Sequence, residues 1–114
     1  MPGLLPVLLI GSHIVLAADR MPELNIEPSC RAAAATGVKG RDAEICKRDE
    51  MTARGTLQQQ WGQFNGEQRA HCLALSTAGG PPSYVELLTC LELAKAASEL
   101  PAESRLNGSA LKRR

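Results

Sequence analysis

Cysteine is the residue type with the widest chemistry in this sequence. The chain has four of them, Cys30, Cys46, Cys72 and Cys90. Cysteines form disulfides, ligate zinc or act in redox catalysis, and their spacing helps to discriminate between these uses. The spacings here are far too long for the Cys-x-x-Cys motif of zinc knuckles and of most redox sites. We therefore predict two structural disulfides, with a zinc site and thiol redox chemistry as the less favoured alternatives.

Other catalytic motifs are missing from the sequence. Serine hydrolysis would need a nucleophile, a base and an orienting acid, yet there is no Gly-x-Ser-x-Gly elbow, and His71 is the only histidine after residue 17. Gly79 and Gly80 are followed by two prolines, not by the Lys-Ser or Lys-Thr of a phosphate-binding loop. We predict no enzymatic activity, no cofactor and no metal, and we interpret His71 as a surface or packing residue.

The first residues have the pattern of a secretory signal peptide. An apolar run from Leu4 to Leu16 leads into small residues, and Val15 and Ala17 occupy the two recognition positions of a cleavage site. We predict that residues 1–17 are removed on export to an oxidising compartment, where disulfides persist. A core helix is one alternative, which the prolines and glycines of the run disfavour. A retained anchor is the other, although the run is shorter than the ~20 residues that span a bilayer.

Turn and cap residues divide the rest of the chain. Residues 18–28 contain two prolines and predict an extended leader that lies outside the bundle. Residues 29–99 are the predicted helical domain with four cysteines, and they show no strand pattern. Residues 100–114 are polar, end in three basic residues and predict a disordered tail. The expected helices are a short one capped by Ser29, one from about Asp42 to Phe64, one from Asn65 to about Thr77, and one after Ser83.

Two of the expected helices carry a stripe at helical spacing. The stripe of the long helix is Cys46, Glu50, Ala53, Leu57, Trp61 and Phe64, and that of the last helix is Leu87, Cys90, Leu91, Ala94 and Ala97. Glu50 is at the edge of its stripe, so we expect a buried stem with the carboxylate at the rim. Trp61 and Phe64 are expected in the core, with a binding hot spot as the alternative for this pair.

Capping residues indicate where the last two helices begin. Asn65 is followed three residues later by Gln68, and Ser83 by Glu86, which is the spacing of a capping box. The run Gly79-Gly80-Pro81-Pro82 between these helices cannot continue a helix. We therefore expect the last two helices to form a hairpin.

The turns favour one of the three pairings that four cysteines allow. In an antiparallel helical hairpin, residues equally far from the turn lie at equal height, because each helix rises ~1.5 Å per residue. Cys30 and Cys46 are about equally far from the first turn, whose middle is Val38 or Lys39. Cys72 and Cys90 are equally far from the second turn, at Pro81. We predict the pairs Cys30–Cys46 and Cys72–Cys90. The nested pairing, Cys30 with Cys90 and Cys46 with Cys72, stays open.

Size and charge limit what the chain can do. The formal net charge is +1 and there are only three aromatic residues, so the sequence has neither the basic field nor the aromatic platforms of a nucleic-acid-binding protein. A domain of about 70 residues rarely gains more than ~3–5 kcal/mol from its core alone. Two disulfides, each worth ~3 kcal/mol in the chain-entropy model, would supply the missing stability. The predicted fold is all-α, a small four-helix bundle of two hairpins stapled by disulfides.

Two stretches carry a resemblance to known proteins. The sequence from Pro28 to Trp61, joined to that from His71 to Ala94, resembles a group of small exported bacterial helical proteins with four cysteines and uncharacterised function. The stretch from Cys30 to Trp61 is also similar to the LprI-like periplasmic lysozyme-inhibitor module, in which two cysteines flank a short helix before a long one. These resemblances imply a location in the bacterial envelope, and the second implies inhibition of a lysozyme-type hydrolase.

Three functional hypotheses are compatible with these patterns. The favoured one is a secreted or periplasmic, non-catalytic protein that binds an envelope protein or a cell-wall component, with no membrane span after signal cleavage. Its expected sign is an exposed apolar patch around Tyr84, Leu88 and Leu93. The alternatives are inhibition of a lysozyme-type hydrolase and thiol-disulfide redox activity, which would need an exposed and labile cysteine pair.

Overall fold

The computed structural model of the chain describes Gly3, residues 20–39 and residues 42–104. The rest of the predicted signal peptide and residues 105–114 of the predicted tail lie outside the described residues. The described part of that tail is not wholly irregular, because residues 102–104 are helical.

The regular structure of the described residues is entirely helical, as the sequence predicts. Besides the short turn at residues 102–104, it consists of α1 (Glu27–Ala35), α2 (Ala43–Gln60), the 3₁₀ turn η2 (Trp61–Gln63), α3 (Gly66–Ala78) and α4 (Tyr84–Ser98). The long helix was expected to continue as an α-helix to Phe64, but its last turn tightens into η2, which is common at helix ends. Phe64 then has an extended backbone, which redirects the chain into α3.

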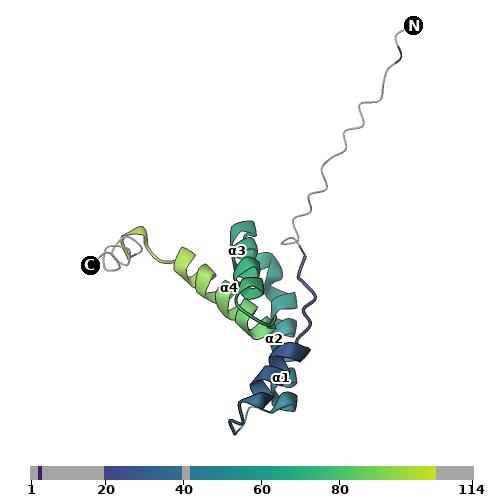
Figure 1. The fold of residues 1–114 in the computed structure, drawn as a ribbon. Helices are drawn as coiled ribbons and strands as arrows, with labels where there is room; N and C mark the ends of the chain where they lie inside the picture. The colour runs from purple at the N-terminus through teal and green to yellow at the C-terminus, as the bar shows by residue number, and fades with distance from the viewer. Residues whose placement is uncertain (1–2, 4–19, 40–41, 105–114) are drawn as a thin grey trace.

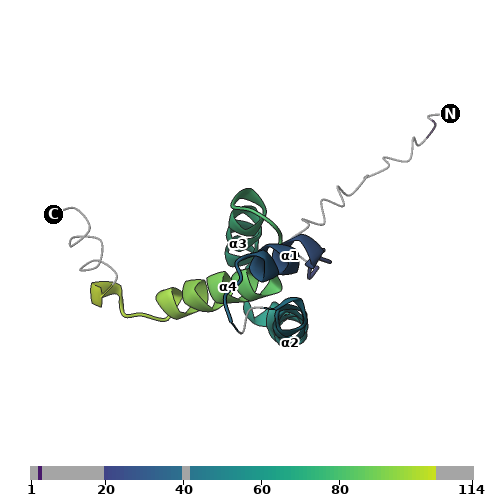
Figure 2. The ribbon, with the colours of Figure 1, turned by 60° about the horizontal axis from the view of Figure 1, so that its bottom comes forward.

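The helices form two hairpins that meet along α2 and α4 (Figure 1). Within each hairpin the helices run antiparallel, and in the view of Figure 2 α4 lies between α2 and α3. The helices α2 and α4 run in the same general direction: Glu50 of α2 contacts the start of α4, and Lys95 Nζ, near the end of α4, donates to Gln63 Oε1 at 3.0 Å. In the sequence, α3 therefore runs back in the opposite direction and connects two helices that point the same way.

Three of the helix starts are capped by local side chains. Asp42 Oδ1 accepts from Ile45 N at 2.8 Å at the start of α2. Asn65 and Gln68 form the predicted reciprocal capping box at the start of α3, with contacts of 2.8 and 3.0 Å. Ser83 caps α4. These side chains satisfy backbone N–H groups that lack a partner within the helix.

The start of α1 differs from the prediction. Ser29 was expected to cap this helix, but α1 begins at Glu27 after Ile26, with Pro28 in its first turn. Proline fits there because the first N–H groups of a helix have no partner within the helix. The Ser29 hydroxyl instead donates to the carbonyl oxygens of Pro81 at 3.3 Å and Pro82 at 2.9 Å. Ser29 thus ties α1 to the turn before α4.

The core lies where α2, α3 and α4 meet. Its largest members are Leu57, Trp61, Phe64, Tyr84, Leu87 and Leu91, all of them buried. The prediction that Trp61 and Phe64 belong to the core is confirmed, and Arg69 covers the Trp61 ring at 5.7 Å from its centroid. Sequence periodicity identified all of these residues except Tyr84, because a surface helix buries one stripe against its neighbours.

The leader packs on the domain, which the sequence did not predict. Met21, Leu24 and Ile26 lie against the core, although residues 20–26 have no regular secondary structure. Leu24 N donates to the Tyr84 hydroxyl at 2.8 Å. The expectation that this whole segment lies outside the bundle is therefore wrong, because its apolar side chains cover the side of the core near Tyr84.

Candidate functional site

The four cysteines form the two predicted disulfides. Cys30 is bonded to Cys46 with a Cα–Cα distance of 5.4 Å, and Cys72 to Cys90 with 5.6 Å. Both distances lie in the usual range for disulfides, so the turns bring the partners together without displacement of the backbone. The nested pairing is thus not the one that forms. All four thiols are used in these bonds.

The two cysteines of each bond differ in burial. Cys30 and Cys72 are 1% and 0% exposed, whereas Cys46 and Cys90 are only partly buried. An attacking thiolate would therefore reach Cys46 and Cys90 more readily than their partners.

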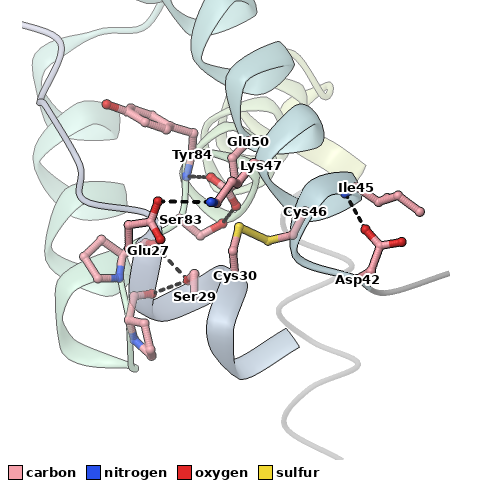
Figure 3. The surroundings of a disulfide bond; sticks show 12 residues. Glu27, Ser29, Cys30, Asp42, Ile45, Cys46, Lys47, Glu50, Ser83 and Tyr84 are labelled. Carbon is pink, nitrogen blue, oxygen red and sulfur yellow. Dashed lines mark hydrogen bonds and ion pairs between the residues drawn. A yellow bond between two sulfur atoms is a disulfide. The ribbon is translucent and has the colours of Figure 1, made fainter. Parts of the chain in front are cut away.

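Glu50 occupies a position that corrects the sequence prediction. Its carboxylate was expected at the rim, but the residue is 4% exposed and lies beside the Cys30–Cys46 bond (Figure 3). Ser83 Oγ donates to Glu50 Oε1 at 2.5 Å, and Tyr84 N donates to Glu50 Oε2 at 2.6 Å. A buried carboxylate needs such donors, and the positive end of the α4 dipole also favours it. Glu50 therefore joins the two hairpins.

The start of α4 uses two acidic residues in different ways. Ser83 Oγ accepts from Glu86 N at 3.2 Å, so Ser83 caps the helix as predicted, but the Glu86 side chain does not complete the predicted capping box at this helix start. The carboxylate bonded to the N-terminal N–H and hydroxyl groups is that of Glu50 from α2. The Glu86 side chain is exposed and borders a surface hollow between α1, α2 and the start of α4.

On the opposite side of this helix start, Tyr84 anchors the leader. Besides its contact to Leu24, the Tyr84 hydroxyl lies 3.5 Å from the carbonyl oxygen of Pro22. Glu23 Oε1 accepts from Arg54 Nη2 at 2.7 Å. The carboxylate of Glu23 and the hydroxyl of Tyr84 raise the pKa of Arg54 above its ordinary value. These contacts hold residues 22–24 between α2 and α4.

The predicted apolar patch is only partly correct. Leu93 is 67% exposed, but Tyr84 is buried and Leu88 packs against the core. Another face of α4, which we call the outward face, carries exposed residues that are mostly apolar: Val85, Thr89, Leu93, Ala96 and, just after the helix end, Leu100. Their spacing of four, four, three and four places them on one stripe. Sequence reasoning followed the buried stripe and identified only Leu93 of this second one, although its spacing was visible.

A hollow borders each end of the outward face. The first, of about 450 Å³, lies between α1, α2 and the start of α4, and its lining includes Ile45, Asp49, Glu50, Val85 and Glu86. The second, of about 290 Å³, lies between the end of α2 and the end of α4, and includes Gln63, Glu92, Lys95, Ala96 and Glu99. Carboxylates thus line both hollows, together with Lys95 in the second one.

Neither a metal site nor a membrane span is found among the described residues. Within these ranges, no three His, Cys, Asp or Glu side chains converge as a metal site would require. No helix in the part of the chain that the structure describes combines the length and apolar content needed to cross a bilayer. His71 lies exposed on α3.

Comparisons with protein-family models, with curated proteins and with solved structures found no match for this chain. The resemblances to exported four-cysteine proteins and to the LprI-like module therefore stay predictions, as do hydrolase inhibition and thiol redox activity. The structural features that bear on function are the outward face of α4 and the two disulfides.

Proposed function

We propose that this protein is a non-catalytic binding domain of the bacterial envelope that contacts another protein through the outward face of α4. The observation that carries the proposal is the pattern of exposure on α4. This helix buries Tyr84, Leu87 and Leu91, and a second row of apolar side chains stays exposed: Val85, Leu93 and, just after the helix end, Leu100 are 40%, 67% and 47% exposed. A surface helix normally has one apolar stripe, which faces the core, and polar residues on its other side. In a domain this small, a second, exposed stripe is typical of an interaction surface.

A location outside the cytoplasm is the second part of the proposal. Two disulfides are consistent with an oxidising compartment, and the N-terminal sequence has the pattern of a signal peptide. We expect the intact mass of the exported protein to correspond to a chain that begins after Ala17. A mature protein that still carries Met1, or one found only in the cytosol, would contradict this part.

A photo-crosslinking amino acid at position 93 tests the binding function. We expect discrete crosslinked products in intact cells from Leu93, and none of the same mass from the matched position His71, which is exposed on α3. The captured protein is then identified, purified and titrated against the parent chain and the Leu93→Gln variant. Equal products from both positions, or equal affinity for both chains, would rule out the outward face as the binding site.

A further inference from the structure

Three of the four charged residues of α4 and its C-cap are acidic and lie beside the outward face. With 3.6 residues per turn, Glu92 and Glu99 lie along one edge of the stripe and Glu86 along the other. All three side chains are exposed. Lys95, the basic residue of this helix, is partly buried and donates to Gln63. The exposed part of α4 is therefore an apolar stripe between carboxylates.

The neighbouring helix adds one exposed carboxylate. Asp49 of α2 lines the first hollow beside Val85, whereas the Glu50 carboxylate at the same hollow is buried and accepts from Ser83 and Tyr84. Arg48 Nε lies 3.8 Å from Asp49 Oδ1, but both side chains are well exposed, and such a pair is weak and screened by salt. The hollow also has the aliphatic side chains of Ile45 and Val85. It can hold the methylene stem of a long basic side chain and present a carboxylate to its charged end.

A second copy of the chain does not fit this surface. The stripe from Val85 to Leu100 is nearly symmetric about its middle, so two copies of α4 could align antiparallel with apolar residues in register. In that arrangement each edge of the stripe faces the same edge of the other copy, so Glu92 of one copy would lie close to Glu92 of the other. In a parallel arrangement the edge with Glu86 would face the edge with Glu92 and Glu99 of the other copy. Like charges across an interface oppose association, so charge excludes what the apolar stripe would allow.

We propose that the outward face of α4 binds an amphipathic helix of another protein whose apolar stripe is flanked by lysine and arginine. This inference rests on the proposed binding function and names the chemistry of the partner. Val85 and Leu100 are 15 positions apart, or ~22 Å at 1.5 Å per residue, which matches a partner helix of about four turns. Apolar anchors of the partner lie along Val85, Leu93 and Leu100. Its basic side chains face Glu86 on one edge and Glu92 and Glu99 on the other.

Model peptides test this proposal on the disulfide-bonded protein. The probe is an 18-residue amphipathic helix of leucine and lysine, and its controls are a scrambled leucine–lysine peptide and a leucine–glutamate helix. We expect the leucine–lysine helix to bind with the highest affinity and to lose affinity as salt rises. Leu93→Gln should weaken binding ~10-fold, because one buried leucine is worth roughly a factor of ten.

Charge variants test whether the carboxylates of Glu86, Glu92 and Glu99 bind the basic peptide, as opposed to a nonspecific attraction between peptide and protein. The triple variant Glu86→Gln, Glu92→Gln, Glu99→Gln should abolish most of the salt dependence. Matched single controls lie on α3: Leu75→Gln removes an exposed leucine, and Glu67→Gln removes an exposed carboxylate. Both controls should bind the peptide as the parent does. Every substituted side chain is exposed, so we expect each variant to unfold at the same temperature as the parent, and this temperature is measured before binding is compared.

Several results would overturn the inference. It is wrong if the leucine–glutamate or scrambled peptide binds equally well, or if the α3 controls weaken binding as much as Leu93→Gln. Self-association that Leu93→Gln abolishes would identify a second copy as the occupant. If replacement of Lys112, Arg113 and Arg114 by neutral residues tightens peptide binding, the occupant of the outward face is the basic end of the chain itself and not another protein. If crosslinking from position 93 captures a protein without a basic amphipathic helix, the binding function stands and only the partner chemistry fails.

Discussion

The two hairpins carry equivalent disulfides in different surroundings. The Cys72–Cys90 bond lies within the core, where Cys72 is fully buried and Cys90 packs against the same cluster. The Cys30–Cys46 bond lies outside that cluster, and Cys46 borders the first hollow. Their sequence separations of 18 and 16 residues are nearly equal, so the chain-entropy contributions are nearly equal as well. Any difference between the two bonds must then come from packing.

The disulfide therefore has a different structural role in each hairpin. In α3 and α4, the disulfide reinforces helices that are already held by Leu87, Leu91 and their neighbours. In α1, Cys30 is the only buried residue of the described helix, and the ion pair of Glu27 with Lys47 is exposed. The disulfide is therefore the main attachment of α1 to the domain.

The largest effect is expected from removal of the core disulfide. Cys72→Ala with Cys90→Ala should lower the free energy of unfolding by ~3 kcal/mol through chain entropy, with a further loss from the vacated core. Urea unfolding of the variant and the parent measures the change. The contrast between the hairpins fails if this variant loses no more global stability than the corresponding Cys30 and Cys46 variant.

The next effect is expected at the carboxylate that joins the hairpins. Glu50→Gln should lower the free energy of unfolding by ~1–3 kcal/mol, because an amide cannot accept from both Ser83 and Tyr84 with its two terminal atoms. The matched control is Glu44→Gln, an exposed residue of the same helix. We expect that control to change stability by less than ~0.5 kcal/mol. Equal effects at the two positions would mean that Glu50 does not join the hairpins.

Removal of the outer disulfide should act locally. In Cys30→Ala with Cys46→Ala, the amides of α1 should exchange with solvent at least ~10-fold faster, since a helix with one buried residue opens without the rest. The amides of α3 and α4 should keep most of their protection. Hydrogen exchange followed by mass spectrometry separates the two regions. A uniform loss of protection would show that α1 is part of the cooperative core.

The smallest effect is expected at Ser29. Ser29→Ala removes the hydroxyl that bonds to Pro81 and Pro82, and should lower stability by ~0.5–1.5 kcal/mol. Thr77→Ala on α3 is the control, because the Thr77 hydroxyl bonds to carbonyl groups of its own helix. Combined with the outer disulfide variant, Ser29→Ala should speed α1 exchange further. No further change in the combined variant would mean that Ser29 does not hold α1.

Local signals in the sequence predicted most of the fold. Asn65, Gln68 and Ser83 lie within a few residues of the backbone groups that they cap, so spacing alone identifies them. Glu86 has the same spacing from Ser83, but Glu50 of α2 supplies the carboxylate at that helix start. The disulfide pairing was predictable for a related reason: each pair spans one turn, and equal distance from a turn gives equal height in a hairpin.

The errors concern residues whose partners are distant in the sequence. Ser29 bonds to residues more than 50 positions away, and Glu50 to residues more than 30 away. A serine near a helix start is compatible with a cap as well as with a long-range bond. A glutamate at the edge of a stripe is likewise compatible with an exposed or a buried carboxylate. The leader was misplaced for the same reason, since its partner Tyr84 lies 60 residues from Leu24. The outward face of α4 was predicted only at Leu93, because Tyr84 and Leu88, which were grouped with it, pack on the core instead.

The order of the cysteines has a consequence for oxidative folding. Each cysteine is bonded to its immediate neighbour in the sequence, first with second and third with fourth. A chain that enters an oxidising compartment from its N-terminus would therefore expose each correct pair before the next cysteine arrives. The shorter loops also close somewhat more readily than the one between Cys46 and Cys72, by roughly twofold in a flexible chain. Native bonding can then proceed hairpin by hairpin, without the reshuffling of bonds that a nested pattern would demand.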